Sequence, residues 1–197
     1  MTTVAPHTEL AIFVGGESRR MGEPKGRLTV PGGSRTILEQ LVERGRDAGL
    51  APLLVGDASA YSGLVPELPR VDDEPLGYGP LGGLRAALAH ACEAGRRHVV
   101  AVACDMPHVM TEALLLLRDH PSEAVVLAPR RGPEAPWEPM LARYDAALLL
   151  PVLDDVIADG RRSFQQLFSE VEVWPIELTP AIERSLEDWD TPGDVVR

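Results

Sequence analysis

Short apolar runs alternate with amphipathic segments of helical period over the first two thirds of the chain, and this alternation limits the fold more than any other feature. Residues 10–14, 51–55 and 98–103 have the composition of buried strands, and residues 98–103 resemble a central parallel strand covered on both faces. Residues 36–48 and 81–95 place apolar side chains on one helical face. The order strand-helix-strand-helix-strand predicts an α/β fold, with a single doubly wound, mostly parallel sheet flanked by helices.

The last third of the chain is less regular but still predicts secondary structure. Ser163 and Gln166 form a capping-box pattern that begins a short helix. The other expected elements are helices at 111–117 and 146–159, a strand at 124–128, an edge strand at 171–176 and a helical turn capped by Thr191 and Pro192. No internal repeat or interdomain linker interrupts the chain, so we expect one domain over residues 1–197.

Charge and composition narrow the class of partner. The chain has 30 acidic and 19 basic side chains, a formal net charge of −11. This balance argues against nucleic acid and anionic membranes as partners, because both attract basic surfaces. Cys92 and Cys104 are too few for a disulfide framework and are expected to be buried thiols in a reducing compartment. Residues 1–9 lack the pattern of a signal peptide, so the expected location is the cytoplasm.

The expected strands end in glycines and aspartates. Ligands bind beyond the carboxyl ends of strands in such sheets, so these residues are candidates for a binding site. The ends are Gly15-Gly16, Gly56-Asp57, Asp72-Asp73 and Asp105.

The loop at residues 15–25 combines two glycines with Arg19, Arg20 and Lys25. Successive backbone amides and nearby cations suit a phosphate, although the loop matches neither the P-loop nor the dinucleotide fingerprint. A polar surface loop with a glycine turn is the alternative. The position directly after the first strand favours phosphate binding.

Asp105 follows the apolar run at 98–103 and is a candidate ligand for Mg²⁺, a cation that prefers oxygen donors. The alternative is that Asp105 caps the helix expected at residue 111. Pro107 and its neighbours place the start of that helix too far along the chain for such a cap.

Residues 15–25, Gly-Gly-x-x-Arg-Arg-Met-Gly-x-x-Lys, resemble the signature of the molybdenum cofactor guanylyltransferase family of the nucleotidyltransferase superfamily. Residues 79–83 and 104–107 resemble the second and third motifs of that family, and residues 139–144 and 160–162 resemble later landmarks. The resemblance covers most of the chain in the right order. It implies a Rossmann-like nucleotidyltransferase fold in which residues 8–110 bind the nucleotide and residues 111–197 bind the acceptor.

The resemblance also implies an activity. The family transfers GMP from GTP to the terminal phosphate of molybdopterin, the organic part of the molybdenum cofactor, and releases pyrophosphate, with Mg²⁺ as cofactor. The acceptor phosphate is the nucleophile, so no protein nucleophile is required. Docking to proteins that make or accept the cofactor is a further expectation.

Two classes of alternative remain open. One is another nucleotidyltransferase, such as a cytidylyltransferase or a sugar-phosphate enzyme, although the double glycine and double arginine favour the guanylyl branch. The other is a nucleotide-binding protein without catalysis, against which Lys25 and Asp105 count.

The predicted site residues fall into four groups. Catalysis by charge cancellation is assigned to Lys25, Arg19, Arg20 and Asp105. Nucleotide contacts are assigned to the strand ends and glycine motifs, namely Phe13, Val14, Gly15, Gly16, Gly22, Lys25, Gly56, Asp72, Gly79 and Asp105. Acceptor contacts are assigned to Arg161, Arg162 and Asp188, and metal contacts to Asp105 and Asp190.

Several of these assignments have open alternatives. Spacing to Gly79 favours Asp72 as the nucleotide contact, with an ambiguity of one residue toward Asp73, and a structural turn is the rival for both. Asp190 stands where the family often has asparagine, and it either binds metal or extends the cap at Thr191. Arg161 and Arg162 are either acceptor contacts or solvated cations at a helix end.

Overall fold

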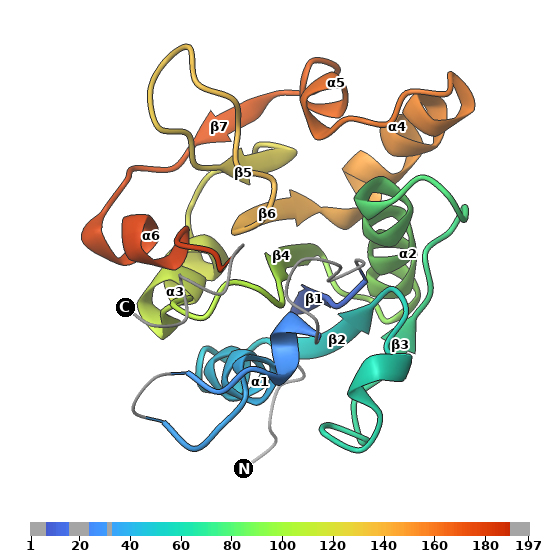
Figure 1. The fold of residues 1–197 in the computed structure, drawn as a ribbon. Coiled ribbons are helices and arrows are strands. Elements are labelled where there is room, and N and C mark those ends of the chain that lie inside the picture. The colour runs from blue at the N-terminus through green and yellow to red at the C-terminus, as the bar shows by residue number, and fades with distance from the viewer. Residues whose placement is uncertain (1–6, 16–23, 31–32, 190–197) are drawn as a thin grey trace.

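Seven strands form one sheet in the middle of the molecule (Figure 1). They are β1 (Thr8–Phe13), β2 (Ala51–Val55), β3 (Arg70–Val71), β4 (His98–Ala103), β5 (Val126–Ala128), β6 (Ala142–Asp145) and β7 (Val173–Pro175). Their order across the sheet is β3-β2-β1-β4-β6-β5-β7. This computed structural model describes residues 7–15, 24–30 and 33–189.

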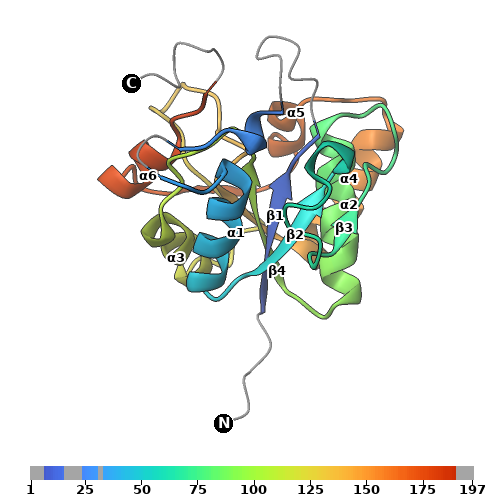
Figure 2. The same cartoon turned by 60° about the horizontal axis from the view of Figure 1, so that its bottom comes forward.

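Helices cover both faces of the sheet, as Figure 2 shows from a second direction. The helices are α1 (Ile37–Asp47), α2 (Pro80–Glu93), α3 (Thr111–Asp119), α4 (Ala146–Ala158), α5 (Phe164–Phe168) and α6 (Pro180–Ser185), with short 3-10 turns η1 (Lys25–Arg27) and η2 (Ser59–Tyr61). One apolar core contains side chains of α1, α3 and α6, and the other contains side chains of α2, α4 and α5. The fold therefore has three layers, helix, sheet and helix.

Strand β1 shows why the sequence pattern produces two cores. Leu10 and Ile12 enter the core beneath α1, whereas Ala11 and Phe13 enter the core beneath α2. Alternate side chains of a strand point to opposite faces, so a continuous apolar run requires cover on both sides.

The predicted fold class is confirmed. Four neighbouring strand pairs are parallel and two, β4 with β6 and β5 with β6, are antiparallel. Helices α1, α2 and α4 are each followed by a glycine of positive φ, namely Gly49, Gly95 and Gly160. Ser163 and Gln166 form the predicted capping box of α5, and β7 lies at the sheet edge as expected.

The sequence pattern missed three elements. Strand β6 has four residues and runs antiparallel between β4 and β5, and β3 has two residues, too few for a recognisable period. Helix α6 begins after Thr179, whose side chain accepts a hydrogen bond from the Ile182 amide. The expected turn at Thr191 lies outside the described residues.

The expectation that both cysteines are buried is half wrong. Cys104 is buried, but Cys92 is exposed near the end of α2, because a helix that covers a sheet turns only one face toward it. Within the described part of the chain, no helix is both long and apolar enough to cross a membrane.

Candidate functional site

A cavity of about 350 Å³ lies beyond the carboxyl ends of β1, β2 and β4. Parallel strands that enter a sheet in the same direction end at the same edge, so residues far apart in the chain meet there. The lining comprises Phe13, Gly15, Val55, Asp57, Asp73, Gly79, Pro80, Ala103, Cys104, Asp105 and Met140. Phe13, Gly15, Gly79 and Asp105 are among the residues that the sequence assigned to the nucleotide.

Lys25 and Asp105 form an ion pair at this cavity. The Lys25 Nζ donates a hydrogen bond of 3.0 Å to Asp105 Oδ2, across 80 positions of sequence. The side chains are 16% and 27% exposed, so water screens the pair only in part. Asp105 does not cap α3, whose N-cap is Met110. The structure thus brings together one predicted cation and the predicted metal ligand.

Lys25 is the only lysine among the 19 basic residues of the chain. The other basic residues of this count are all arginines. In the described part of the chain, every surface ion pair of a lysine or an arginine is therefore made by an arginine. An ammonium is a compact point charge, whereas a guanidinium is a wide planar fork. The single lysine of the chain thus lies in the ion pair at the cavity.

Glycines allow the chain to approach itself closely around the cavity. Gly56 has a φ of +90°, and a Cβ there would lie 3.1 Å from the backbone of Gly15. A Cβ on Gly83 of α2 would lie 2.9 Å from both Phe13 Cε1 and Val55 Cγ1. These glycines hold β1, β2 and α2 together at the strand ends. Val14, another predicted contact, is 4% exposed and packs in the core instead of lining the cavity.

Helix α2 begins at the cavity. Its N-cap, Gly79, has a φ of +55° and open space around its Cβ position, and no side chain caps the helix. Pro80 at the first helical position has no N–H, and the amides of Gly82 and Gly83 donate to the Gly79 carbonyl at 3.0 and 3.3 Å, so these amides are not open to a ligand. Gly79 therefore has open space beside the cavity, whereas Gly82 and Gly83 are buried in packing.

Asp72 and Asp73 occupy different places. Asp73 lines the 350 Å³ cavity, whereas Asp72 lines only a neighbouring, larger cavity. Burial, and then the charge of Asp72, raise the pKa of Asp73 above its usual range. A half-buried carboxylate in this position can accept hydrogen bonds from hydroxyl or amine donors of a ligand.

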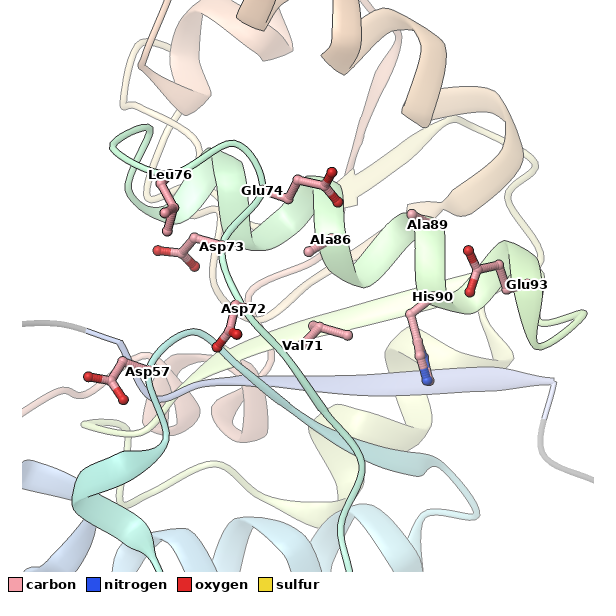
Figure 3. A pocket seen from close by; sticks show the side chains of 10 residues that line it. All are labelled: Asp57, Val71, Asp72, Asp73, Glu74, Leu76, Ala86, Ala89, His90 and Glu93. Carbon is pink, nitrogen blue, oxygen red and sulfur yellow. The ribbon is translucent and has the colours of Figure 1, made fainter.

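The neighbouring cavity has a volume of about 570 Å³ and lies between β3 and α2. Figure 3 shows Asp57, Asp72 and Asp73 near one end of it and His90 and Glu93 near the other. The charged side chains that line this cavity are acidic, apart from His90. The cavity therefore repels a triphosphate. The smaller cavity, beside Lys25, is the better candidate for the nucleotide.

The segment before residue 190 packs against Asp105. The Trp189 amide donates a 2.9 Å hydrogen bond to the Asp105 carbonyl, and the Trp189 ring meets His108 edge to face at 6.1 Å. Asp188 is exposed beside it. The chain therefore returns to the strand-end site directly before Asp190.

The described residues contain no cluster of three or more histidine, cysteine, aspartate or glutamate side chains that could hold a metal ion by themselves. Asp105 supplies one hard oxygen donor at the cavity. Magnesium in nucleotide enzymes is commonly held by one or two carboxylates together with phosphate oxygens of the substrate. The donor set fits a cation that arrives with a nucleotide, and it does not fit a closed structural site.

The two predicted acceptor arginines are engaged elsewhere. Arg161 donates to Glu170 at 2.6 Å and to Asp159 at 3.1 Å. The guanidinium of Arg162 lies 4.8 Å from the centre of the Tyr78 ring and donates to the Gly77 carbonyl at 3.2 Å. Arg162 therefore contacts the loop that leads to Gly79, whereas the charge of Arg161 is neutralised by Asp159 and Glu170.

Five predicted site residues lie outside the described residues: Gly16, Arg19, Arg20, Gly22 and Asp190. Met140, which lines the cavity, belongs to the segment 139–144 that resembles a family landmark, although no contact was assigned to it from the sequence. Leu141 follows it with a φ of +66°, which is rare for a leucine.

Comparisons with known proteins show the family of the chain. Residues 10–173 match the family model described as the MobA-like NTP transferase domain. A protein of Mycolicibacterium paratuberculosis named "Probable molybdenum cofactor guanylyltransferase" is 31% identical over 196 residues, which cover 93% of this chain and 91% of that protein. A protein of the same name from Opitutus terrae is 39% identical over 99 residues, and the match spans about half of each chain, 50% of this one and 48% of the relative.

A solved structure from Archaeoglobus fulgidus, described as molybdopterin-guanine dinucleotide biosynthesis protein A, has the same fold. It superposes with a TM-score of 0.74 over 95% of each chain, at 24% sequence identity. At that identity the likeness shows the fold alone.

Proposed function

This chain belongs to the family of MobA-like NTP transferases, and from that premise we propose that it transfers GMP from GTP to the terminal phosphate of molybdopterin. The chain is a nucleotidyltransferase, and enzymes of this family generally depend on a metal ion. The observation that carries the proposal is the Lys25–Asp105 pair at the strand-end cavity. A cation beside a carboxylate at the mouth of a nucleotide-sized cavity suits transfer to a phosphate.

In the proposed reaction two anions must approach one another. An oxygen of the acceptor phosphate forms a bond to the α-phosphorus of GTP, the bond between the α- and β-phosphates breaks, and pyrophosphate leaves with the electron pair. Charge cancellation and positioning therefore supply most of the rate. Lys25 would hold its ammonium against the phosphate oxygens.

Asp105 would hold Mg²⁺ at this site, and Asp190 is the proposed second ligand. The cation would neutralise charge on the phosphate oxygens. The hydrogen bond from Trp189 to Asp105 supports this pairing, because it ties the residue before Asp190 to the same loop. Arg19 and Arg20 are proposed to bind phosphate beside Lys25.

The nucleoside would lie in the cavity between β1, β2 and α2. Phe13, Gly15 and Gly79 line it, and Gly56 packs against Gly15 at its floor. We assign Asp73 to a hydrogen bond with the nucleoside, since Asp73 lines this cavity. Gly16 and Gly22 remain proposed contacts from the same loop as Lys25, whereas Asp72 faces the neighbouring cavity.

The test measures pyrophosphate release with Mg²⁺ and each of the four nucleoside triphosphates, with and without molybdopterin. Release with GTP only in the presence of molybdopterin is the expected result. Release with CTP would show that the nucleotide substrate is CTP and not GTP. Tight nucleotide binding without release would favour a noncatalytic protein. Asp105→Asn should lower the rate of release by about 10²- to 10³-fold. The matched control is Arg46→Met, which removes one partner of an exposed 2.9 Å ion pair with Glu67.

A further inference from the structure

The position of the Lys25 ammonium depends on a short turn of backbone. Lys25 begins the 3-10 turn η1, in which the Leu28 amide donates to the Lys25 carbonyl at 3.0 Å. The Ile37 amide then donates to the Leu28 carbonyl at 2.9 Å and joins this turn to α1. A shift of the turn would move the lysine away from Asp105, since a 3-10 turn has few hydrogen bonds of its own.

Gly26, the middle residue of this turn, lies against an aromatic ring. A Cβ on Gly26 would be 2.8 Å from Tyr61 Cε1 and 3.3 Å from Cys104 Cβ. Gly26 is buried, and it is not among the glycines of positive φ. Glycine is therefore required here by lack of space and not by backbone conformation.

Arg27, the last residue of the turn, is fixed to the same neighbour. Its guanidinium donates hydrogen bonds to the carbonyls of Ala60 and Ser62, which flank Tyr61. The turn that holds Lys25 thus contacts η2 in two ways, through the glycine on the ring and through the arginine on the carbonyls.

Tyr61 also contacts the residue beside Asp105. The Tyr61 hydroxyl lies 3.5 Å from the Cys104 Sγ, and the tyrosine is 2% exposed. Burial raises the pKa of Tyr61, so its hydroxyl stays protonated. One rigid ring therefore touches the chain neighbour of Lys25 and the chain neighbour of Asp105.

The turn that carries Tyr61 is itself anchored at the end of β2. Asp57 Oδ1 accepts a 2.9 Å hydrogen bond from the Ser59 amide, and the Tyr61 amide donates to Ala58 at 2.9 Å. These two hydrogen bonds fix the turn of residues 57–61 directly after β2.

We infer that Tyr61 is a positioning residue of the transfer reaction, which sets the place of Lys25 relative to Asp105 by packing between Gly26 and Cys104. The expected effect on the reaction rate rests on the proposed function. The expected effect on the position of Lys25 does not depend on which acceptor or nucleotide binds.

The test enlarges the side chain at position 26 and makes the side chain at position 61 smaller. Gly26→Ala forces a methyl group against the ring, Tyr61→Leu removes the Cε1 edge, and the double variant combines the two. Each single variant should lower kcat by about 10- to 100-fold with a smaller change in the KM for GTP. The double variant should recover at least part of that loss, because leucine leaves room for the added methyl group.

The matched control is Gly45→Ala on α1. A Cβ at Gly45 would lie 2.4 Å from Leu10 Cδ2, so this variant overpacks the core to a similar degree away from Lys25. It should lower the melting temperature while kcat per folded molecule stays at the wild-type value. If Gly45→Ala lowers kcat as much as Gly26→Ala, the loss reflects general destabilisation and the inference is overturned.

A spectroscopic measurement separates this inference from the proposed function. Lys25 is the single lysine, so protein labelled with ¹³C-lysine gives one side-chain Cε signal in a ¹H–¹³C spectrum. The signal should move in Gly26→Ala and Tyr61→Leu, return toward wild type in the double variant and stay unchanged in Gly45→Ala. Should Gly26→Ala fail to fold, Tyr61→Leu alone decides. An unmoved signal in folded Tyr61→Leu overturns the inference even if GTP proves not to be the substrate.

Discussion

The strand-end cavity and the segment from residue 159 to residue 170 both pair cations with carboxylates. The partners are distant in sequence at the cavity and close in sequence in the later segment. At the cavity, Lys25 meets Asp105 from a distant part of the chain. In the later segment, Arg161 pairs with Asp159 and Glu170, which are its sequence neighbours. Local pairs form wherever opposite charges are close in sequence, whereas a distant pair in a cavity has to be built by the fold.

The difference shows which charges are available to a ligand. Arg161 pairs with one carboxylate before α5 and one after it, and such largely exposed pairs have little effect on their surroundings. Asp105 lies beyond the end of β4 and Lys25 pairs with it from η1, so a ligand with its own charges can replace one partner by another at the cavity. The cavity is thus the part of the described molecule best suited to exchange charge with a substrate.

The largest effect is expected from removing the charges at the cavity. Lys25→Met and Asp105→Asn should each lower kcat by about 10²- to 10³-fold, since charge stabilisation in a preorganised site has that magnitude. Pyrophosphate release measures the loss, and circular dichroism should show a folded protein. Lys25→Arg should recover little activity, because the guanidinium is wider than the ammonium. Wild-type rates in Lys25→Met would remove the contrast between the two regions.

Filling the space between β1, β2 and α2 should lower the stability of the protein, which is a smaller effect than the loss of kcat above. Gly83→Ala places a Cβ 2.9 Å from Phe13 and Val55, and overpacking of this kind costs about 1–3 kcal/mol. The gain in helix propensity offsets up to about 1 kcal/mol of that cost. Urea unfolding should therefore show a lower stability. Gly15→Ala is the matched control, because its Cβ would meet other atoms no closer than 3.6 Å.

Asp73→Asn should affect stability and nucleotide binding in opposite directions. The pKa of Asp73 is raised in the folded state above its ordinary value of 3.8, so the folded protein binds more protons than the unfolded chain as pH rises past that value. Stability is therefore lost as pH rises through the folded pKa, and asparagine avoids that loss.

At pH 7 Asp73→Asn should be at least as stable as wild type, and the difference should vanish near pH 3. Its affinity for GTP should fall by about tenfold, the cost of one hydrogen bond to a charged group. Thermal unfolding across pH and isothermal titration with GTP measure the two effects. A more stable variant with unchanged affinity would exclude Asp73 from the nucleotide site, and Asp72→Asn serves as the comparison.

The smallest effect is expected in the later segment. Arg162→Met should raise the KM for molybdopterin by about three- to fivefold, and Arg161→Met by less than about twofold, because its charge is already neutralised. Steady-state kinetics with varied acceptor distinguish the two. Equal and large effects would mean that the acceptor displaces Asp159 and Glu170 from Arg161, and the contrast between the regions would then be wrong.

Much of the site could be predicted because its residues stand at strand ends. The run at 98–103 is recognisable from apolar composition, and Asp105 follows it at once. Gly15 and Gly79 belong to glycine motifs next to predicted elements. Spacing to Gly79 favoured Asp72, whereas Asp73 lines the cavity, since β3 has two residues and no period to say which side chain faces it.

The sequence by itself determined the α/β class, the parallel core and the positions of most helices, because apolar periodicity and helix stops are local properties. Only the tertiary structure decided that β6 enters the sheet antiparallel, that Lys25 meets Asp105 and that Gly26 rests on Tyr61. Each of these contacts joins residues more than 30 positions apart. Contacts over such distances follow from how elements pack and leave no periodic trace in the chain.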